Sequence, residues 1–352
     1  MSSLEILGVG TVGADADAVR RASLSAAELA ARWEETPFPA TTAYAPVELD
    51  VKRQLGRKGT SFFDRRTALT ILAARDALTD AGIDLEAVDR SRGGVVLGTA
   101  IGSIQSSVDY SVASFTQDPP HLVNPGLFPN TVMNGAAGQA AIWFGLTGVN
   151  ATIGGGSMAF LSVLRYAKSL FDTDQSDLLV VGVVDELTPV GAWVAGGRED
   201  VRGCLAEGGA LFVVRATDQE TPDRPQVVGV TIGFAPSSAP RVEALARCAT
   251  EALSDAGVAP EEVACVVGLS ADELASFPSS AWLAGPGIEN LDRAPLDGGN
   301  ELADPATDMI ALARVLGAPT AETAFRRYGL LLASSDEGAV GCAVLRGPSW
   351  HS

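Results

Sequence analysis

A short internal repeat constrains the fold of this chain more than any other feature. Residues 77–88 read ALTDAGIDLEAV and residues 252–263 read ALSDAGVAPEEV, identical at seven of twelve positions and offset by 175 residues in a chain of 352. Each copy joins a helix end to a capping glycine, and an apolar strand follows. The repeat predicts a two-fold duplicated α/β architecture. The alternative is that both copies are helix endings of a common type.

Apolar segments of strand and helix length alternate along the chain. Strands that are apolar on both faces and alternate with helices are typical of α/β folds with buried, largely parallel sheets. The polar stretch 217–225 is the one plausible boundary, which predicts an N-terminal half of residues 1–216 and a C-terminal half of residues 226–352. The pattern predicts strands over 4–9, 94–98, 150–154, 178–184 and 330–345, and helices over 63–81, 158–171 and 306–316.

Composition excludes several classes of partner. The chain has 43 acidic and 25 basic residues, for a formal net charge of −18. Such a surface is repelled by nucleic acid and by anionic membranes, so we expect neither. No apolar run approaches the roughly 18–20 residues that span a bilayer, and no signal peptide is recognisable. Four scattered cysteines without CxxC spacing favour a cytoplasmic protein without disulfides or zinc.

Histidine is scarce, because only His121 and His351 occur. Metal sites and acid–base catalysis depend heavily on this residue, so we expect no metal and no cofactor. His121 lies in a predicted loop, and His351 is the penultimate residue.

Residues 8–13, GVGTVG, match the GxGxxG pattern that lets a pyrophosphate approach a helix N-terminus. A nucleotide site of that type also needs a second strand that ends in an acid roughly 20 residues further on. Residues 14–33 are alanine-rich and helical in pattern instead. A glycine-rich turn after a strand is therefore favoured over nucleotide binding.

Ser157 lies in GGGSMA, residues 154–159, between a predicted strand and a predicted helix. This arrangement approximates the nucleophile elbow of α/β-hydrolases. A serine nucleophile needs a general base, and His351 is the only histidine that follows Ser157. Two interpretations stay open: a serine-dependent acyltransferase or hydrolase, and a helix-capping serine, which is favoured.

Residues 127–142, LFPNTVMNGAAGQAAI, resemble the LFPNTVxNxxxGxxxI segment of β-ketoacyl synthases. The resemblance implies a thiolase-like, duplicated five-layer αβαβα fold. The short stretch after Asp304 and Pro305 implies that the C-terminal half is shortened. Further segments that resemble motifs of this family are residues 63–82, 94–102, 148–161 and 178–189.

The catalytic positions depart from the family pattern. Ser157 stands where the resemblance places the nucleophilic cysteine, and Leu296 where it places the first catalytic histidine. The second histidine has no counterpart, and the glycine-rich gating motif, at residues 335–340, keeps one glycine. The resemblance therefore implies a chain with no catalytic residues.

A fold kept without its catalytic groups resembles the chain-length factor of type II polyketide synthases. This implies a heterodimer with an active ketosynthase subunit, in which this chain shapes the acyl tunnel. Acyl carrier proteins are acidic, so at −18 this chain is expected to meet the carrier only indirectly, through its partner. A stand-alone acyl-binding scaffold of thiolase fold is the further alternative.

The resemblance also assigns a tunnel and an interface. Ser103, Ser106 and Tyr110 match tunnel-gating positions, and their spacing puts them on one helical face. The alternative is an ordinary polar helix, and Met133 could equally fill the core. The positions expected at the dimer interface are Phe128, Met133, Val149, Asn150, Ala151, Thr152 and Ile153.

Overall fold

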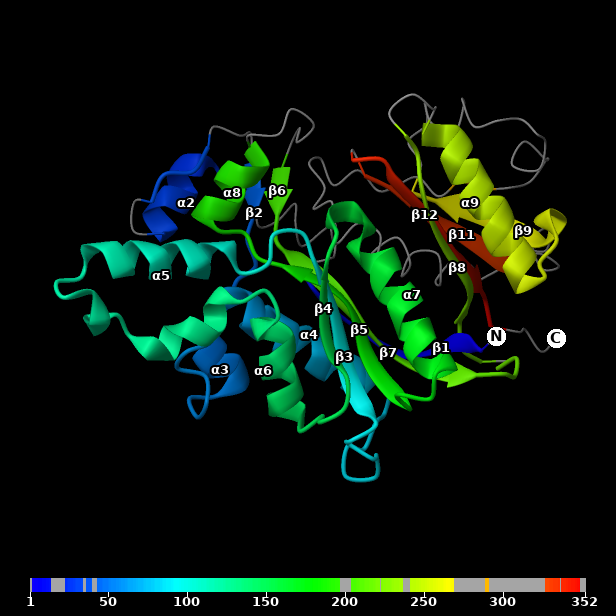
Figure 1. The fold of residues 1–352 in the computed structure, drawn as a ribbon, viewed down its shortest axis with the longest axis horizontal. Coiled ribbons are helices and arrows are strands. Elements are labelled where there is room, and N and C mark those ends of the chain that lie inside the picture. The colour runs from blue at the N-terminus through cyan, green and yellow to red at the C-terminus, as the bar shows by residue number, and fades with distance from the viewer. Residues whose placement is uncertain are drawn as a thin grey trace.

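The computed structural model describes residues 2–13, 23–33, 36–39, 43–196, 204–221, 223–236, 241–268, 289–290, 327–335 and 337–348. Within them, ten strands form one sheet in the order β10-β9-β11-β12-β8-β1-β7-β5-β3-β4, and β2 pairs with β6 (Figure 1). The strands are β1 (Ser3–Val12), β2 (Ala43–Ala45), β3 (Gly93–Thr99), β4 (Asn150–Gly154), β5 (Leu178–Asp185), β6 (Cys204–Ala206), β7 (Gly208–Thr217), β8 (Gln226–Phe234), β9 (Val263–Val267), β10 (Glu289–Asn290), β11 (Tyr328–Ser334) and β12 (Ala339–Arg346).

The strand order repeats itself about the β1–β8 pair. Running outward, β1-β7-β5-β3-β4 and β8-β12-β11-β9-β10 have the same sequence of antiparallel, antiparallel, parallel and parallel neighbours. The two copies of the sequence repeat occupy equivalent places, since each contains the end of a long helix, α4 or α9, and leads into a strand with parallel neighbours. The duplication predicted from residues 77–88 and 252–263 is therefore confirmed. The sheet is mixed, however, so the expectation of largely parallel strands is wrong.

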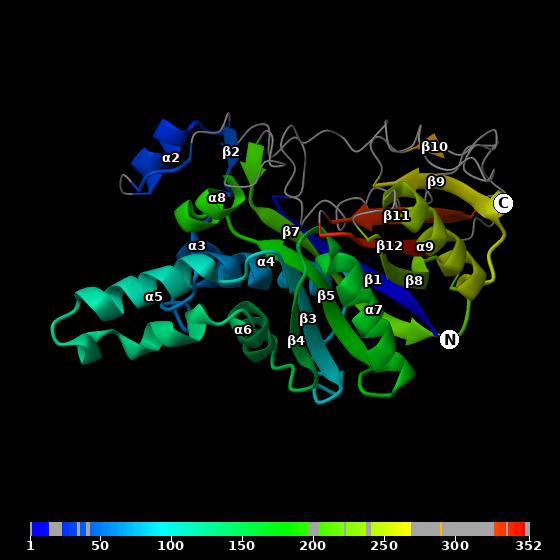
Figure 2. The same cartoon turned by 45° about the horizontal axis from the view of Figure 1, so that its top comes forward.

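Helices complete five layers, which can be followed in Figure 1 and Figure 2. We call β1-β7-β5-β3-β4 the first half-sheet and β8-β12-β11-β9-β10 the second. The helices α4 (Arg65–Asp80) and α6 (Gly135–Phe144) cover the outer face of the first half-sheet. The helix α7 (Ala159–Asp172) packs between the two half-sheets, and α9 (Arg241–Ala256) covers the outer face of the second. Phe160 of α7 lies 5.5 Å from Phe212 between ring centroids, in the central apolar layer.

The first two glycines of the GxGxxG segment, Gly8 and Gly10, serve this packing. A Cβ on Gly10 would lie 2.0 Å from the Ala73 carbonyl oxygen, and one on Gly8 would lie 2.3 Å from the Ala81 nitrogen. The backbone of α4 therefore crosses β1 too closely for any side chain. In the second half, Gly229 admits α9 in the same way, 2.7 Å from the Ala252 oxygen. The close approach of helix and strand accounts for these glycines without a nucleotide.

Two boundaries differ from the expectations, and a third segment is not described. The segment 330–345, predicted as one strand, forms the antiparallel hairpin β11–β12, because Gly338 at φ 97° turns the chain. Of the segment 14–33, which was expected to be helical, residues 23–33 are described, and within them the helix α2 covers only Ala26–Arg32. The helix expected over 306–316 lies outside the described residues. Further short helices are α3 (Val51–Leu55), α8 (Pro189–Gly196), η3 (Gly156–Met158) and η4 (Pro260–Glu262).

An arm projects from the first half. It consists of α5 (Ile104–Thr116), η1 (Pro120–Leu122) and η2 (Pro125–Thr131), and both views show it extending away from the sheet (Figures 1 and 2). No residue of α5 is fully buried.

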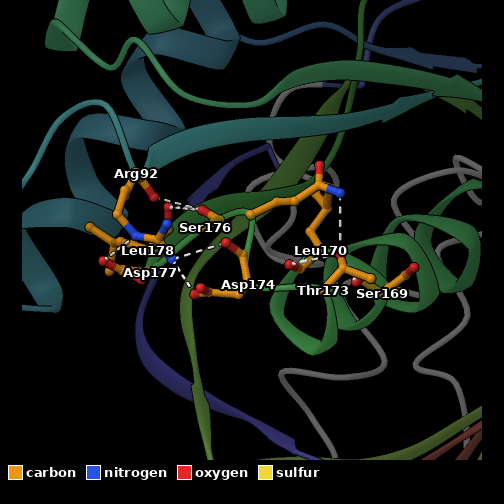
Figure 3. Close-up of polar contacts among 9 residues, drawn as sticks. Arg92, Ser169, Leu170, Thr173, Asp174, Ser176, Asp177 and Leu178 are labelled. Atoms are coloured by element: carbon orange, nitrogen blue, oxygen red, sulfur yellow. Dashed lines mark hydrogen bonds and ion pairs between the residues drawn. The ribbon is translucent and has the colours of Figure 1, made fainter.

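At the end of the first half-sheet where β3 and β5 begin, Arg92 forms ion pairs with Asp174 and Asp177 of the turn between α7 and β5 (Figure 3).

Candidate functional site

The site is built where β4 meets α7. β4 ends at Gly154, Gly156 takes a left-handed φ of 53°, and Ser157 follows in η3, directly before α7. A sharp turn that needs a glycine thus places Ser157 at the N-terminal end of a buried helix, as the elbow pattern predicts. The Ser157 hydroxyl donates a hydrogen bond of 2.7 Å to the backbone oxygen of Ser334, at the end of β11.

This hydrogen bond engages the Ser157 hydroxyl as a donor. A hydroxyl that donates to a carbonyl oxygen has its proton directed at a group that cannot accept it as a base. Among the residues that the structure describes, no histidine, lysine or carboxylate makes a hydrogen bond to Ser157. His121 lies in η1 of the arm, and His351 is outside the described residues. The expected helix-capping role is wrong, because α7 has Met158 at its N-cap and no side-chain capping bond, while Ser157 joins the two halves.

Asp185 shapes the loop beside Ser157. Its carboxylate accepts hydrogen bonds from the Thr99 hydroxyl at 2.6 Å and the Ala100 amide at 3.0 Å, and Thr99 in turn accepts from the Gly102 amide at 2.9 Å. These bonds bend the chain from β3 toward α5. Burial raises the pKa of Asp185 to about 6, although the bonds from Thr99 and Ala100 oppose the rise.

A second buried acid lies next to a buried cation. The Arg66 amide donates to Glu186 at 3.1 Å, and the Arg66 guanidinium donates to the backbone oxygen of Met133. Burial, and then the nearby Asp64 carboxyl, raise the pKa of Glu186 to about 8. Arg66 Nε, Arg66 Nη1 and Glu186 Oε1 have no hydrogen-bond partner among the described residues. This cluster was not predicted from the sequence, although the adjacent acids Asp185 and Glu186 after an apolar strand could have indicated it.

The three expected tunnel residues separate into two groups. Ser106 and Tyr110 line a cavity of about 340 Å³ between α5, η1 and η2. Tyr110 also packs edge-on against Phe128, with ring centroids 5.8 Å apart. Ser103 does not line the cavity: it is buried and lies 3.4 Å from the backbone oxygen of Val132. The remaining residues of the cavity wall are Asp109, Ala113, Gln117, Leu122, Val123, Asn124, Leu127 and Asn130.

The expected interface residues lie on and beside the edge strand β4 and on the arm. β4, which carries Asn150, Ala151, Thr152 and Ile153, ends the strand order of the described sheet, and Val149 directly precedes it. Met133 connects this edge to the arm, because its side chain lies beside both Gly102 and Gly154. Phe128 is 56% exposed and Met133 44%, so Met133 is not core filling. The other large apolar side chains exposed on the arm and α6 are Val108, Val112, Phe115, Leu122, Leu127, Val132 and Ile142.

Several positions that the resemblance singled out are not among the residues that the structure describes. Leu296, Asp304 and Pro305 fall outside the described residues. Within the described ranges, no group of three or more His, Cys, Asp or Glu side chains could hold a metal ion. The described helices also include none that is long and apolar enough to cross a membrane.

Comparisons with known proteins agree with this architecture. Residues 23–201 match the family described as beta-ketoacyl synthase, N-terminal domain. The chain is 24% identical over 263 residues to 3-oxoacyl-[acyl-carrier-protein] synthase 2 of Coxiella burnetii, covering 66% of this chain and 63% of that protein. It is 31% identical over 140 residues to granaticin polyketide putative beta-ketoacyl synthase 1 of Streptomyces violaceoruber, covering 36% and 31%. These alignments span less than two thirds of either relative.

The fold extends over nearly the whole chain. The solved structure of the ishigamide ketosynthase/chain length factor superposes with a TM-score of 0.73 at 28% sequence identity, covering 98% of this chain and 99% of that one. The duplicated, layered architecture is therefore that of the thiolase-like ketosynthases.

Proposed function

Because the chain belongs to the β-ketoacyl synthase family, we propose that it is a non-catalytic subunit that resembles a chain-length factor. It pairs with an active ketosynthase and shapes the tunnel that receives the growing acyl or polyketide chain. The hydrogen bond from Ser157 to the Ser334 carbonyl carries this proposal. Condensation requires an activated nucleophile and donors for the developing oxyanion, and a serine held by a carbonyl supplies no nucleophile. The absence of a family histidine at Leu296 supports the same conclusion.

The partner binds along the edge of β4 and the arm. An edge strand presents unpaired backbone groups that another strand can complete, and β4 is only half-buried. The apolar side chains exposed beside it, above all Phe128, Met133 and Ile142 at 56%, 44% and 74%, would be buried in such a complex. We propose Phe128, Met133 and residues 149–153 as the core of this interface, and residues 1–216 and 226–352 as the two halves of the subunit.

The cavity under α5 contributes to the acyl tunnel. Ser106 and Tyr110 line it, and the small Ser106 side chain leaves space that a larger residue would fill. We propose that these two positions limit chain length directly, and that buried Ser103 acts by holding α5 against Val132. The acyl carrier protein reaches this cytoplasmic complex through the ketosynthase partner, since the net charge of −18 repels an acidic carrier at long range.

Co-expression with a ketosynthase encoded beside this chain tests the pairing. The expected result is an equimolar complex that elongates acyl chains, whereas a stable homodimer that gains nothing from the ketosynthase would favour a stand-alone scaffold. In the reconstituted complex, Ser157→Ala should leave synthesis intact. Loss of synthesis in that variant, with the complex still formed, would favour the serine-dependent acyltransferase or hydrolase instead.

The tunnel assignment is tested on the same complex. Ser106→Phe should shorten the products measured by mass spectrometry, because the ring fills the cavity. Ser111→Phe is the matched control: Ser111 is exposed on the same helix and does not line the cavity. Equal product lengths for Ser106→Phe and wild type would refute the assignment.

A further inference from the structure

Arg66 is a fully buried cation that ties the arm to the rest of the first half. It lies in the first turn of α4, and its side chain is buried completely. Its Nη2 donates a hydrogen bond to the backbone oxygen of Met133, where the chain returns from the arm to α6. The Met133 side chain lies beside Gly102, just before α5, and beside Gly154, at the end of β4. The bond from Arg66 therefore helps to fix the place where the arm meets the edge strand.

The remaining donors of the Arg66 side chain are unused. Nε and Nη1 have no hydrogen-bond partner among the described residues. Buried donors without a partner are rare in folded proteins, because they have lost their hydrogen bonds to water. Glu186 Oε1 has no partner in the described part of the chain either, although Glu186 Oε2 accepts from the Arg66 amide at 3.1 Å. A cation with unused donors and an acid with an unused acceptor thus lie next to each other.

Glu186 is the acid of this cluster that can still gain a partner. The charged groups that face it are Asp64, which caps α4, Arg65 and Arg66 in the first turn of α4, Glu207 between β6 and β7, and its neighbour Asp185 on β5. Asp64, Asp185 and Glu207 each accept hydrogen bonds on both carboxyl oxygens. Of these four carboxyls, Glu186 alone therefore keeps an oxygen for a new bond.

The charge of Glu186 decides what the Arg66 side chain binds. Because burial and the Asp64 carboxyl raise the pKa of Glu186 to about 8, Glu186 is protonated at neutral pH. Once ionised, a buried carboxylate needs a paired cation to compensate for its lost hydration. The guanidinium is a rigid planar fork and turns as a unit. Turning Nε or Nη1 to Glu186 therefore carries Nη2 away from the Met133 oxygen.

We propose that Arg66 is a positioning residue for the edge that the partner binds: its guanidinium holds Met133 while Glu186 is protonated, and turns to Glu186 when that carboxyl ionises. The inference rests on the proposed function for the identity of this edge, and it adds a means of regulating the same surface. Raising the pH loosens the junction between the arm and β4.

The test is nuclear magnetic resonance of the full chain, labelled with carbon-13 in the methionine methyl groups, from about pH 6 to about pH 10. The chain has four methionines, and Met133→Leu identifies the signal of Met133 by its loss. This signal should shift in a single step with a midpoint near pH 8. Met158, buried in the central apolar layer, is the internal control and should not shift.

Two variants remove the pair one member at a time. Glu186→Gln removes the ionisation and Arg66→Leu removes the cation, so each should abolish the step at Met133. The matched control is Glu5→Gln. Glu5 is also a buried acid bonded to an arginine, Arg215, but it lies on β1 and pairs with β7 and β8. The Met133 signal of this control should titrate as in wild type.

The proposal is wrong if the wild-type Met133 signal does not shift, or if it shifts equally in Glu186→Gln. A step retained in Arg66→Leu would show that Arg66 does not transmit the ionisation. The same step at Met158, or its loss in Glu5→Gln, would show a change of the whole fold instead. If Arg66→Leu does not fold, Glu186→Gln and Glu5→Gln still decide the outcome. The measurement needs no ketosynthase, so its failure is distinct from failure of the co-expression test.

Discussion

Replacing Gly10 by alanine tests why the GxGxxG segment is there. The added Cβ would lie 2.0 Å from the Ala73 oxygen and 2.4 Å from the Ala77 nitrogen, whereas an ordinary contact is 3.4–4 Å. Both atoms belong to the backbone of α4, so no side-chain rotation relieves the clash. The helix and β1 must separate by more than an ångström along most of their crossing.

The expected loss of unfolding free energy follows from that separation of α4 and β1. Overpacking a core typically costs about 1–3 kcal/mol, and a clash between two backbones belongs at the upper end. Because α4 and β1 lie in the tightly packed layer of the first half, we expect Gly10→Ala to lower the free energy of unfolding by about 3 kcal/mol. Urea denaturation followed by circular dichroism measures this change.

Gly138→Ala provides the matched control. Gly138 is a helical residue of α6 with no atom within 4 Å of the position its Cβ would take. The same substitution there should raise stability by about 0.5–1 kcal/mol, since alanine favours the helix. The packing account fails if Gly10→Ala is as stable as wild type. It also fails if a dinucleotide raises the melting temperature of wild type and not of Gly10→Ala.

Three further changes probe other parts of the fold. The raised pKa of Glu186 means that the folded state binds the carboxyl proton more tightly than the unfolded state does, so the stabilisation from this proton is present below about pH 4 and is lost as the pH rises through about 8. Glu186→Gln should therefore flatten the fall in the urea midpoint between pH 5 and pH 9. An unchanged slope would contradict a buried, protonated Glu186. Phe160→Ala, which removes a fully buried ring between the half-sheets, should lower the unfolding free energy by about 3–5 kcal/mol in calorimetry, and a loss below about 1 kcal/mol would contradict the central position of α7. Arg92→Ala should lower the urea midpoint only slightly, because both of its carboxylate partners are mostly exposed and water screens the ion pairs. A loss of unfolding free energy as large as that of Phe160→Ala would contradict this expectation.

The sequence predicted the elements that depend on local pattern. The repeat at residues 77–88 and 252–263 predicted the duplication, because a helix cap and the apolar pattern of a strand are visible in residues that are close together along the chain. β4 and β5 were placed within a residue for the same reason. The position of Ser157 at a turn before a helix followed from the glycines that precede it.

Contacts between distant residues were decided by the tertiary structure alone. Ser157 donates a hydrogen bond to the Ser334 carbonyl, 177 residues away, and Arg65 donates one to Glu207, 142 residues away. The residues around one partner in the sequence contain no pattern that predicts the other partner. The antiparallel centre of the sheet depends likewise on which strands the folded chain brings side by side. The sequence by itself determined a duplicated α/β chain with a serine at an elbow. The packing of one half against the other decided that the Ser157 hydroxyl donates a hydrogen bond to a backbone carbonyl, because hydrogen-bond partners are determined by distance in space.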